Sequence, residues 1–332
     1  MAEGQSRDAF VRALQSVDGI RQRHADVEVM VLDPTPEHLA RPILGDHFQG
    51  MQCLHVPGQS YDGQKNAAAL AVQGEFLAFL DGDCVPTSED WLEHLLRPFA
   101  RSDVHAVGGL TLYEGEGITA KAMTVLDFGF LFSPARDGTL GCYASNNVAF
   151  RRASYLQVMA PDEGALRSYC YKHAQLMSRS GMPVHAQHSA LVRHELPDIE
   201  KERTRRGYDY VAALWADPLL PESAALVCSH QFARKLVGYN AMLALTRLGA
   251  APPALAISQS NAAPIATEIR RLMALDLRGA LEALEIGEAR GLNARTRAAH
   301  AEWRATSGQA QVTMGRSGSS PTLSGHRSKS RT

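Results

Sequence analysis

The sequence has few of the features that mark secreted or membrane-spanning proteins. Its 332 residues include five cysteines, an odd number, and no two of them form a C-x-x-C pair. This excludes a disulfide framework and a zinc ribbon, and we expect the cysteines to serve packing in a reducing cytoplasm. The N-terminal segment MAEGQSRDAF lacks the apolar core of a signal peptide. No apolar run approaches the roughly 20 residues that a membrane-spanning helix needs.

The sequence also lacks an excess of charge of either sign. Its 34 lysines and arginines balance 35 aspartates and glutamates, which gives a formal net charge of -1. Such a chain has no long-range attraction to nucleic acid, so we expect no nucleic-acid partner, and a phosphate must be bound by a local site. With 45% hydrophobic residues, the chain can bury one large core or two modest ones.

Strand and helix patterns alternate through roughly the first 200 residues. Apolar residues recur at helical spacing from residue 6 to about 20, and a β-branched run at 27–32 then ends at Asp33, before two prolines. The pattern continues with strands at 52–56 and 75–80, helices at 63–73 and 88–99, extended segments at 104–107, 140–150 and 182–192, a Gly-rich connection at 113–138 and a helix at 166–180. This alternation predicts an α/β fold with a doubly wound, mostly parallel sheet and flanking helices.

The character of the chain changes after Pro197. Residues 198–303 are helical in pattern and mixed in charge, whereas residues 304–332 are rich in Ser and Gly, basic, and too poor in apolar residues for a core. We therefore predict an α/β domain over 1–197, a helical C-terminal region over 198–303 and a disordered tail over 304–332. Apolar residues accompany Arg234 and Lys235 in 225–247, which indicates either a core-facing helix or peripheral contact with the inner face of a membrane.

Two aspartates follow the expected strand at 75–80. Asp81 and Asp83 flank Gly82, whose missing side chain permits a tight turn and the close approach of a ligand. Two carboxylates in such a turn can bind one hard divalent cation, Mg²⁺ or Mn²⁺, and ligands of open α/β sheets collect at the carboxyl ends of strands. Asp-Gly is also ordinary turn chemistry, so the triplet alone does not establish a site.

The triplet lies within a longer set of characteristic residues. These are Gly58, Lys65-Asn66, Gly74-Glu75, Leu80-Asp81-Gly82-Asp83, Pro86 and Trp91-Leu92, followed by the segments Asn146–Arg152 and Gly181–His194. Their order and separation resemble family 2 glycosyltransferases of the GT-A fold. In that family the pattern is a glycine, a loop with Arg-Asn, an Ala-rich helix, Gly-Glu, an apolar strand into Leu-Asp-x-Asp, then Pro and Trp-Leu. The likeness covers roughly residues 8 to 197.

The resemblance implies a GT-A fold and an enzyme that moves a sugar from a nucleotide-diphosphate sugar to an acceptor hydroxyl. The acceptor would be a glycan, a lipid or a small molecule, and the cofactor Mg²⁺ or Mn²⁺. The implied metal ligands are Asp81, Asp83 and His194. The residues implied near the nucleotide sugar are Asp33, Asp62, Lys65, Asn66, Asp81, Asn146 and Asn147. Structural alternatives remain for several of them, because Asp33 can close a turn and Asn147 can satisfy backbone groups at a strand bend.

Two parts of the family pattern are missing. Family members open with a strand of the type Val-Val-Ile-Pro-Thr-Tyr-Asn, whereas MAEGQSRD leads directly into a helix, so either the start codon is set too late or part of the nucleotide pocket is lost. Inverting members often carry the general base in a Glu-Asp pair eleven residues before the glycine that matches Gly181. Here that place holds Tyr169-Cys170, and a thiol with an ordinary pKa of about 8.5 is a poor base. The remaining candidates are Asp162 and Glu163, or an acceptor that needs little activation.

These gaps leave a second interpretation open. The chain could be a catalytically silent protein that binds a nucleotide sugar, or a protein partner, on a degenerate transferase scaffold. A third class, the sugar nucleotidyltransferases, needs a Gly-rich loop with Arg and Lys after the first strand, and no such loop is visible.

Overall fold

A helix opens the described part of the chain. The computed structural model describes residues 6–161, 169–215, 243–244 and 246–290. Ser6 caps helix α1 (Arg7–Arg23), and its hydroxyl accepts a hydrogen bond of 3.0 Å from the amide of Ala9. The helix expected from the apolar spacing is therefore present.

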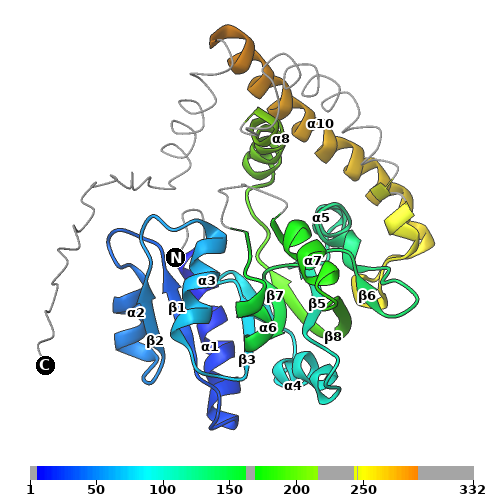
Figure 1. Ribbon diagram of the computed structural model, residues 1–332. Coiled ribbons are helices and arrows are strands. Elements are labelled where there is room, and N and C mark those ends of the chain that lie inside the picture. The colour runs from blue at the N-terminus through cyan, green and yellow to red at the C-terminus, as the bar shows by residue number, and fades with distance from the viewer. Residues whose placement is uncertain (1–5, 162–168, 216–242, 245, 291–332) are drawn as a thin grey trace, which may run out of the picture.

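Most of the predicted strands and helices follow, together with short elements that the sequence did not indicate. The first half contains β1 (Met30–Asp33), α2 (Ala40–His47), β2 (Gln52–His55), α3 (Tyr61–Ala71), β3 (Phe76–Leu80), β4 (Cys84–Pro86), α4 (Trp91–Leu96) and β5 (Ala106–Tyr113). The second half contains α5 (Ile118–Phe128), β6 (Thr139–Leu140), β7 (Asn147–Arg151), α6 (Arg152–Gln157), α7 (Tyr169–Arg179), β8 (Val184–His194), α8 (Ile199–Trp215) and α10 (Gln259–Arg290). Figure 1 shows their arrangement.

The strands form two sheets. β1 and β2 pair in parallel by themselves, and the other strands follow the order β3-β7-β5-β8-β4, with β6 also paired to β8. β5 and β8 are parallel, whereas β7 is antiparallel to both β3 and β5. As a result β3, β5 and β8 share one direction, and their carboxyl ends meet at one edge of the sheet. The predicted α/β fold class is confirmed, and Asp81 and His194 both lie at this edge.

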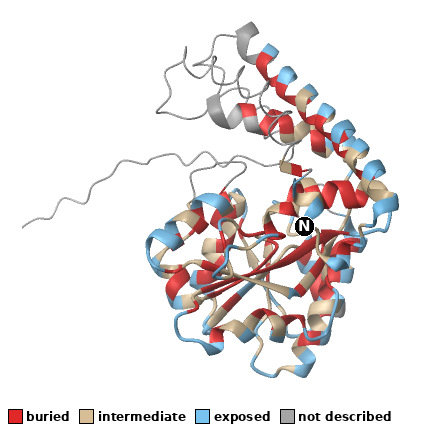
Figure 2. Ribbon diagram, turned by 90° about the vertical axis from the view of Figure 1, so that its right-hand side faces the viewer, coloured by how far each residue is buried: buried red, intermediate tan, exposed pale blue. Residues whose placement is uncertain are grey.

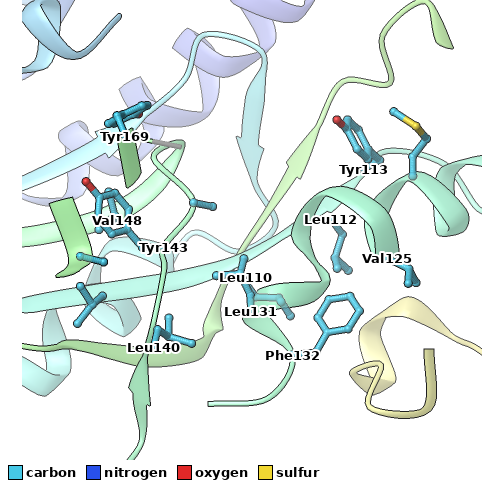
Figure 3. Packing of buried hydrophobic residues seen from close by; sticks show 14 of the residues in the cluster. Leu110, Leu112, Tyr113, Val125, Leu131, Phe132, Leu140, Tyr143, Val148 and Tyr169 are labelled. Atoms are coloured by element: carbon cyan, nitrogen blue, oxygen red, sulfur yellow. The ribbon is translucent and has the colours of Figure 1, made fainter. Parts of the chain in front are cut away.

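Apolar side chains cover both faces of the larger sheet. β5 is buried along its whole length, and its successive residues face opposite sides. On one face Leu110 and Leu112 pack with residues of α5, α7 and α10, and Figure 3 shows part of this cluster. On the other face Val107 packs with α4 and with Ile20 of α1. The sheet edge that holds the candidate site is therefore supported by a packed core on each side.

The segment 113–138 differs from the expected long connection. It contains α5, which is buried on almost all sides, and the short 3₁₀ turn Gly129–Leu131. A helix buried all around has no polar face and therefore no amphipathic stripe in its sequence. Glycines at 115 and 117 precede the helix and gave the segment its loop-like composition.

The helices α8 and α10 lie side by side at one end of the molecule (Figures 1 and 2). They approach each other at two glycines, because a Cβ on Gly207 would overlap the backbone carbonyl of Asp276, and a Cβ on Gly279 would overlap that of Thr204. None of the helices within the described ranges is long and apolar enough to span a membrane. Most of the segment 225–247 and the predicted tail lie outside the described residues.

A buried ion network joins these helices to α5. Arg203 of α8 donates to Asp127 at 2.6 Å and also to Asp276 of α10, and the three side chains are at most 5% exposed. Arg206 also donates to Asp127. Tyr113, at the end of β5, donates to the other oxygen of Asp127 at 2.9 Å. The network therefore reaches from the C-terminal helices to the sheet edge that holds the candidate site.

Asp276 gives this network a pH dependence. Burial raises the pKa of Asp276 from its ordinary value of 3.8 to about 6, against the lowering effect of Arg203. The unfolded chain therefore releases the Asp276 proton at a lower pH than the folded protein, so the stability contribution is present below about pH 4 and is lost as the pH rises through about 6. The rise of the Asp276 pKa from 3.8 to about 6 corresponds to about 3 kcal/mol in the free energy of unfolding. We expect Asp276→Asn to remove this part of the pH dependence of the free energy of unfolding, measured in urea between pH 4 and pH 7. Equal pH slopes in variant and wild type would contradict this assignment.

Candidate active site

A tight turn follows β3 and positions the two aspartates. The amide of Cys84 donates to the carbonyl of Asp81 at 3.0 Å, which closes the turn around Gly82. β4 then pairs antiparallel with β8, and Cys84 lies opposite His194 in the register. The amide of Glu195 donates to the carbonyl of Asp83 at 2.8 Å. These backbone bonds bring Asp83 beside the end of β8, a strand that lies about 110 residues later in the chain.

Asp83 and His194 form the first part of the site. The Oδ1 atom of Asp83 lies 3.8 Å from Nε2 of His194, and both side chains are 18% exposed. The other ring nitrogen of His194, Nδ1, lies 2.7 Å from the carbonyl oxygen of Glu195. Because a carbonyl can only accept, Nδ1 carries the proton and Nε2 keeps its lone pair for a metal. The ring also packs edge-on against Tyr113, with 5.1 Å between ring centroids, which fixes its orientation.

The pair belongs to a group with metal-binding geometry. Within the described ranges, one set of three residues with His, Cys, Asp or Glu ligand atoms meets this criterion: Asp83, Cys84 and His194. Their ligand atoms lie within 4.8 Å of one another. Two of the three metal ligands that the resemblance implied, Asp83 and His194, are therefore brought together.

Asp81 makes a different set of contacts. Both of its carboxylate oxygens lie 2.5 Å from the hydroxyl of Tyr61, and Oδ1 lies 3.2 Å from Nζ of Lys65. Burial, followed by the charge of Asp81, raises the pKa of Tyr61 well above its ordinary value, so the tyrosine is the proton donor. Lys65 compensates the charge of Asp81, whose role as a metal ligand remains a prediction.

Lys65 is held in a small polar and aromatic enclosure. Its ammonium donates to the carbonyl of Ser145 at 2.7 Å and lies 4.6 Å from the ring centroid of Tyr61 and 5.1 Å from that of Phe79. The hydroxyls of Tyr61 and Ser145 are 3.1 Å apart. Lys65 is therefore a buried cation beside Asp81 rather than a solvated residue on the surface of α3. The sequence pointed to Lys65 but not to Tyr61 or Ser145, although both are next to predicted site residues in the chain.

Three of the other implied residues are held by protein contacts. Asp33 is 0% exposed and accepts from the amide and hydroxyl of Thr35 and from the amide of Ala40. Burial by itself would raise the pKa of Asp33, but the hydrogen bonds from Thr35 and Ala40 together hold it below its ordinary value. Asp62 is 2% exposed in the first turn of α3. Asn66 of α3 accepts from the hydroxyl of Tyr155 in α6 and donates to the carbonyl of Ala160 after α6, each at 2.9 Å. Their contact with a nucleotide sugar stays a prediction.

The two asparagines before and in β7 are both buried. Asn146 accepts from the hydroxyl of Thr111 at 2.9 Å. Asn147 is 0% exposed, donates to the carbonyls of Leu110 and Ala190, and accepts from the indole of Trp91 at 3.0 Å. It fills the place where the register of β5 and β8 shifts after Gly109. Asn147 thus satisfies backbone groups at a strand irregularity, the structural alternative stated above.

These contacts predict a stability effect for Asn147. Asn147→Ala leaves two buried carbonyls and one indole N–H without their partner, and we expect a loss of about 2 kcal/mol in the free energy of unfolding. The measurement is urea unfolding at constant pH. A variant with unchanged stability but weaker binding of a nucleotide sugar would instead support a direct role in ligand binding.

The two candidate general bases lie beyond the residues that the structure describes. Asp162 and Glu163 lie within 162–168, outside the described residues. The structure places Cys170 in α7, and burial raises the pKa of its thiol. The thiol is therefore protonated at neutral pH, which agrees with its exclusion as a base.

Comparison with known proteins extends the resemblance. Residues 8–158 match the family model described as glycosyl transferase family 2. The similarity inferred from the motifs is confirmed over this segment. No curated protein matches the sequence.

Solved structures support the fold. The chain is similar to the mannosyltransferase PcManGT from Pyrobaculum calidifontis in complex with GDP-Man and Mn²⁺, with a TM-score of 0.51 and 16% identity over 84% of each chain. It is more distantly similar to GalNAc-T7 with UDP, GalNAc and Mn²⁺, with a TM-score of 0.45 and 11% identity over 65% of this chain and 49% of that one. At such identities the first likeness shows the GT-A fold and nothing more specific.

Proposed function

We propose that this chain, whose residues 8–158 carry a family 2 glycosyltransferase domain, moves a sugar from a nucleotide-diphosphate sugar to an acceptor hydroxyl with the help of Mg²⁺ or Mn²⁺. The observation that carries the proposal is the convergence of Asp83 and His194 at the carboxyl edge of the sheet, beside the buried pair of Asp81 and Lys65. Ligands of α/β sheets bind at this edge.

The donor set fits a divalent cation. Asp83 supplies a carboxylate oxygen and His194 a ring nitrogen whose partner nitrogen is already hydrogen-bonded, as is usual for a metal-ligating histidine. These two residues would hold the ion. When bound, the cation supplies positive charge next to the departing nucleoside diphosphate.

The chain itself supplies position and charge. Lys65 and Tyr61 fix the carboxylate of Asp81 from the side of α3, so that its orientation is set before a ligand arrives. In the transfer, a bond forms between the acceptor oxygen and the anomeric carbon, and the bond from that carbon to the diphosphate breaks. The acceptor proton goes to a base, for which Asp162 and Glu163 remain the candidates.

The test is an assay of purified protein with Mn²⁺ or Mg²⁺ and a panel of GDP- and UDP-sugars that includes GDP-mannose. We expect release of nucleoside diphosphate together with sugar transfer to one class in a panel of lipid, glycan and small-molecule acceptors. Calorimetry with the same donors separates the alternative, because donor binding without any product would support the catalytically silent protein. If the protein neither binds a donor nor turns it over, both the transferase and the silent donor-binding protein are contradicted.

A further inference from the structure

A buried cysteine lies against the proposed cation site. Cys84 is 0% exposed, follows Asp83 directly and lies opposite His194 in the register of β4 and β8. Its Sγ is 3.8 Å from Oδ1 of Asp83, the same separation that joins this oxygen to Nε2 of His194. A sulfur, an oxygen and a nitrogen ligand atom therefore converge on one place.

The spacing suits coordination of a single ion. Tetrahedral bonds of about 2.0–2.3 Å place the ligand atoms about 3.3–3.8 Å apart. Two of the separations are 3.8 Å, and the third, from sulfur to imidazole nitrogen, is at most 4.8 Å. A small contraction around an ion would bring all three into bonding distance. No backbone rearrangement is needed, because strand pairing already holds Cys84 and His194 side by side.

We infer that Cys84 is a third ligand of the cation held by Asp83 and His194. The inference rests on the proposed function, since it concerns the same ion. One thiolate, one imidazole and one carboxylate would supply three ligands to the ion. Of the two cations in the proposed function, such a set favours Mn²⁺ over Mg²⁺, and it binds borderline cations such as Co²⁺ and Zn²⁺ more tightly still. On binding, the Cys84 thiol loses its proton to solvent, and the sulfur–metal bond replaces the S–H contact with Asp83.

Cobalt provides a direct probe of the sulfur. Full-length protein freed of metal with a chelator is titrated with Co²⁺, and the near-ultraviolet thiolate-to-cobalt charge-transfer band is recorded. We expect the band in the wild type and in Cys53→Ser, because Cys53 is an exposed cysteine of β2 outside the cluster. Cys84→Ser should lack the band and bind Co²⁺ at least about tenfold more weakly. Persistence of the band in Cys84→Ser, or absence of the band or of Co²⁺ binding in the wild type, would overturn the inference.

A second measurement does not depend on the folding of a variant. X-ray absorption at the cobalt edge of the loaded wild type should show sulfur in the first coordination shell, and a shell of oxygen and nitrogen alone would refute the assignment. Neither measurement requires turnover. If the protein transfers sugar but cobalt has no sulfur ligand, the inference about Cys84 fails and the proposed function is unaffected. If cobalt is bound by sulfur but no sugar is transferred, the proposed function fails and the Cys84 ligand is still supported.

Discussion

Replacing Asp83 by Ala is expected to lower kcat/KM for sugar transfer by at least about 100-fold. The reason is the geometry at the start of β4 and the end of β8: without the carboxylate, the proposed cation loses the oxygen that lies 3.8 Å from Nε2 of His194. The charge that develops on the leaving diphosphate is then poorly compensated. Initial rates with Mn²⁺ and the preferred donor measure the effect, and calorimetry with Mn²⁺ alone should show a parallel loss of metal affinity.

The matched control is Asp103→Ala. Asp103 is also an aspartate, but its side chain is 67% exposed and is paired only with the exposed Arg101 in the structure described. We expect wild-type rates from this variant. Wild-type turnover by Asp83→Ala would instead show that the Asp83 carboxylate is not part of the active site. The double variant Asp81→Ala with Asp83→Ala should be inactive, because it also breaks the pair with Lys65.

Replacing Arg203 by Met is expected to cost about 3–5 kcal/mol of the free energy of unfolding. The change keeps much of the side-chain volume but removes the cation that lies between Asp127 and Asp276. Two carboxylates then remain in a region from which water is excluded, with less compensating charge. Thermal unfolding should show a fall in Tm of roughly 10 °C. Tyr113 donates to Asp127 and packs on His194, so the loss should also reach the candidate site.

Arg101→Met provides the comparison for this prediction. It removes an arginine from an ion pair whose two side chains are 65% and 67% exposed. Exposed pairs contribute at most about 1 kcal/mol, so we expect a much smaller change. Similar losses in the two variants would show that the buried network contributes no more than a surface pair.

The parts of the fold that the sequence predicted are those with a strong local signal. The β-branched and apolar runs gave β1 and β3, and the Asp-Gly-Asp turn and the final histidine were correctly placed at the ends of β3 and β8. The helix α5 was missed because its burial on almost all sides leaves no polar stripe. Strand direction was anticipated only in part, since nothing within residues 140–151 reveals that β7 enters between β3 and β5 in the opposite direction.

The sequence pointed to some residues of the candidate site but not to the contacts among them. Asp83 and His194 were both expected, yet their pairing depends on a strand register formed across about 110 residues. The bonds of Lys65 and Tyr61 to Ser145 span 80 and 84 residues, and a single sequence gives no signal for such contacts. Cys84 was assigned to packing together with the other four cysteines, because their number is odd and no two of them form a C-x-x-C pair. Its position beside two ligand atoms is visible only once β4 and β8 are paired.

The separation of the β1–β2 sheet from the larger sheet has a consequence for motion. Hydrogen bonds within each sheet hold it together, but the structure pairs neither β1 nor β2 with β3. One connection between the halves is α1, whose Phe10 and Leu14 pack on the small sheet while Ile20 packs on the large one. Side-chain contacts of this kind break more easily than the backbone hydrogen bonds between paired strands. We therefore expect the small sheet to open as a separate cooperative unit. The backbone amides of β1 and β2 should accordingly exchange with solvent deuterium well before those of β5 and β8.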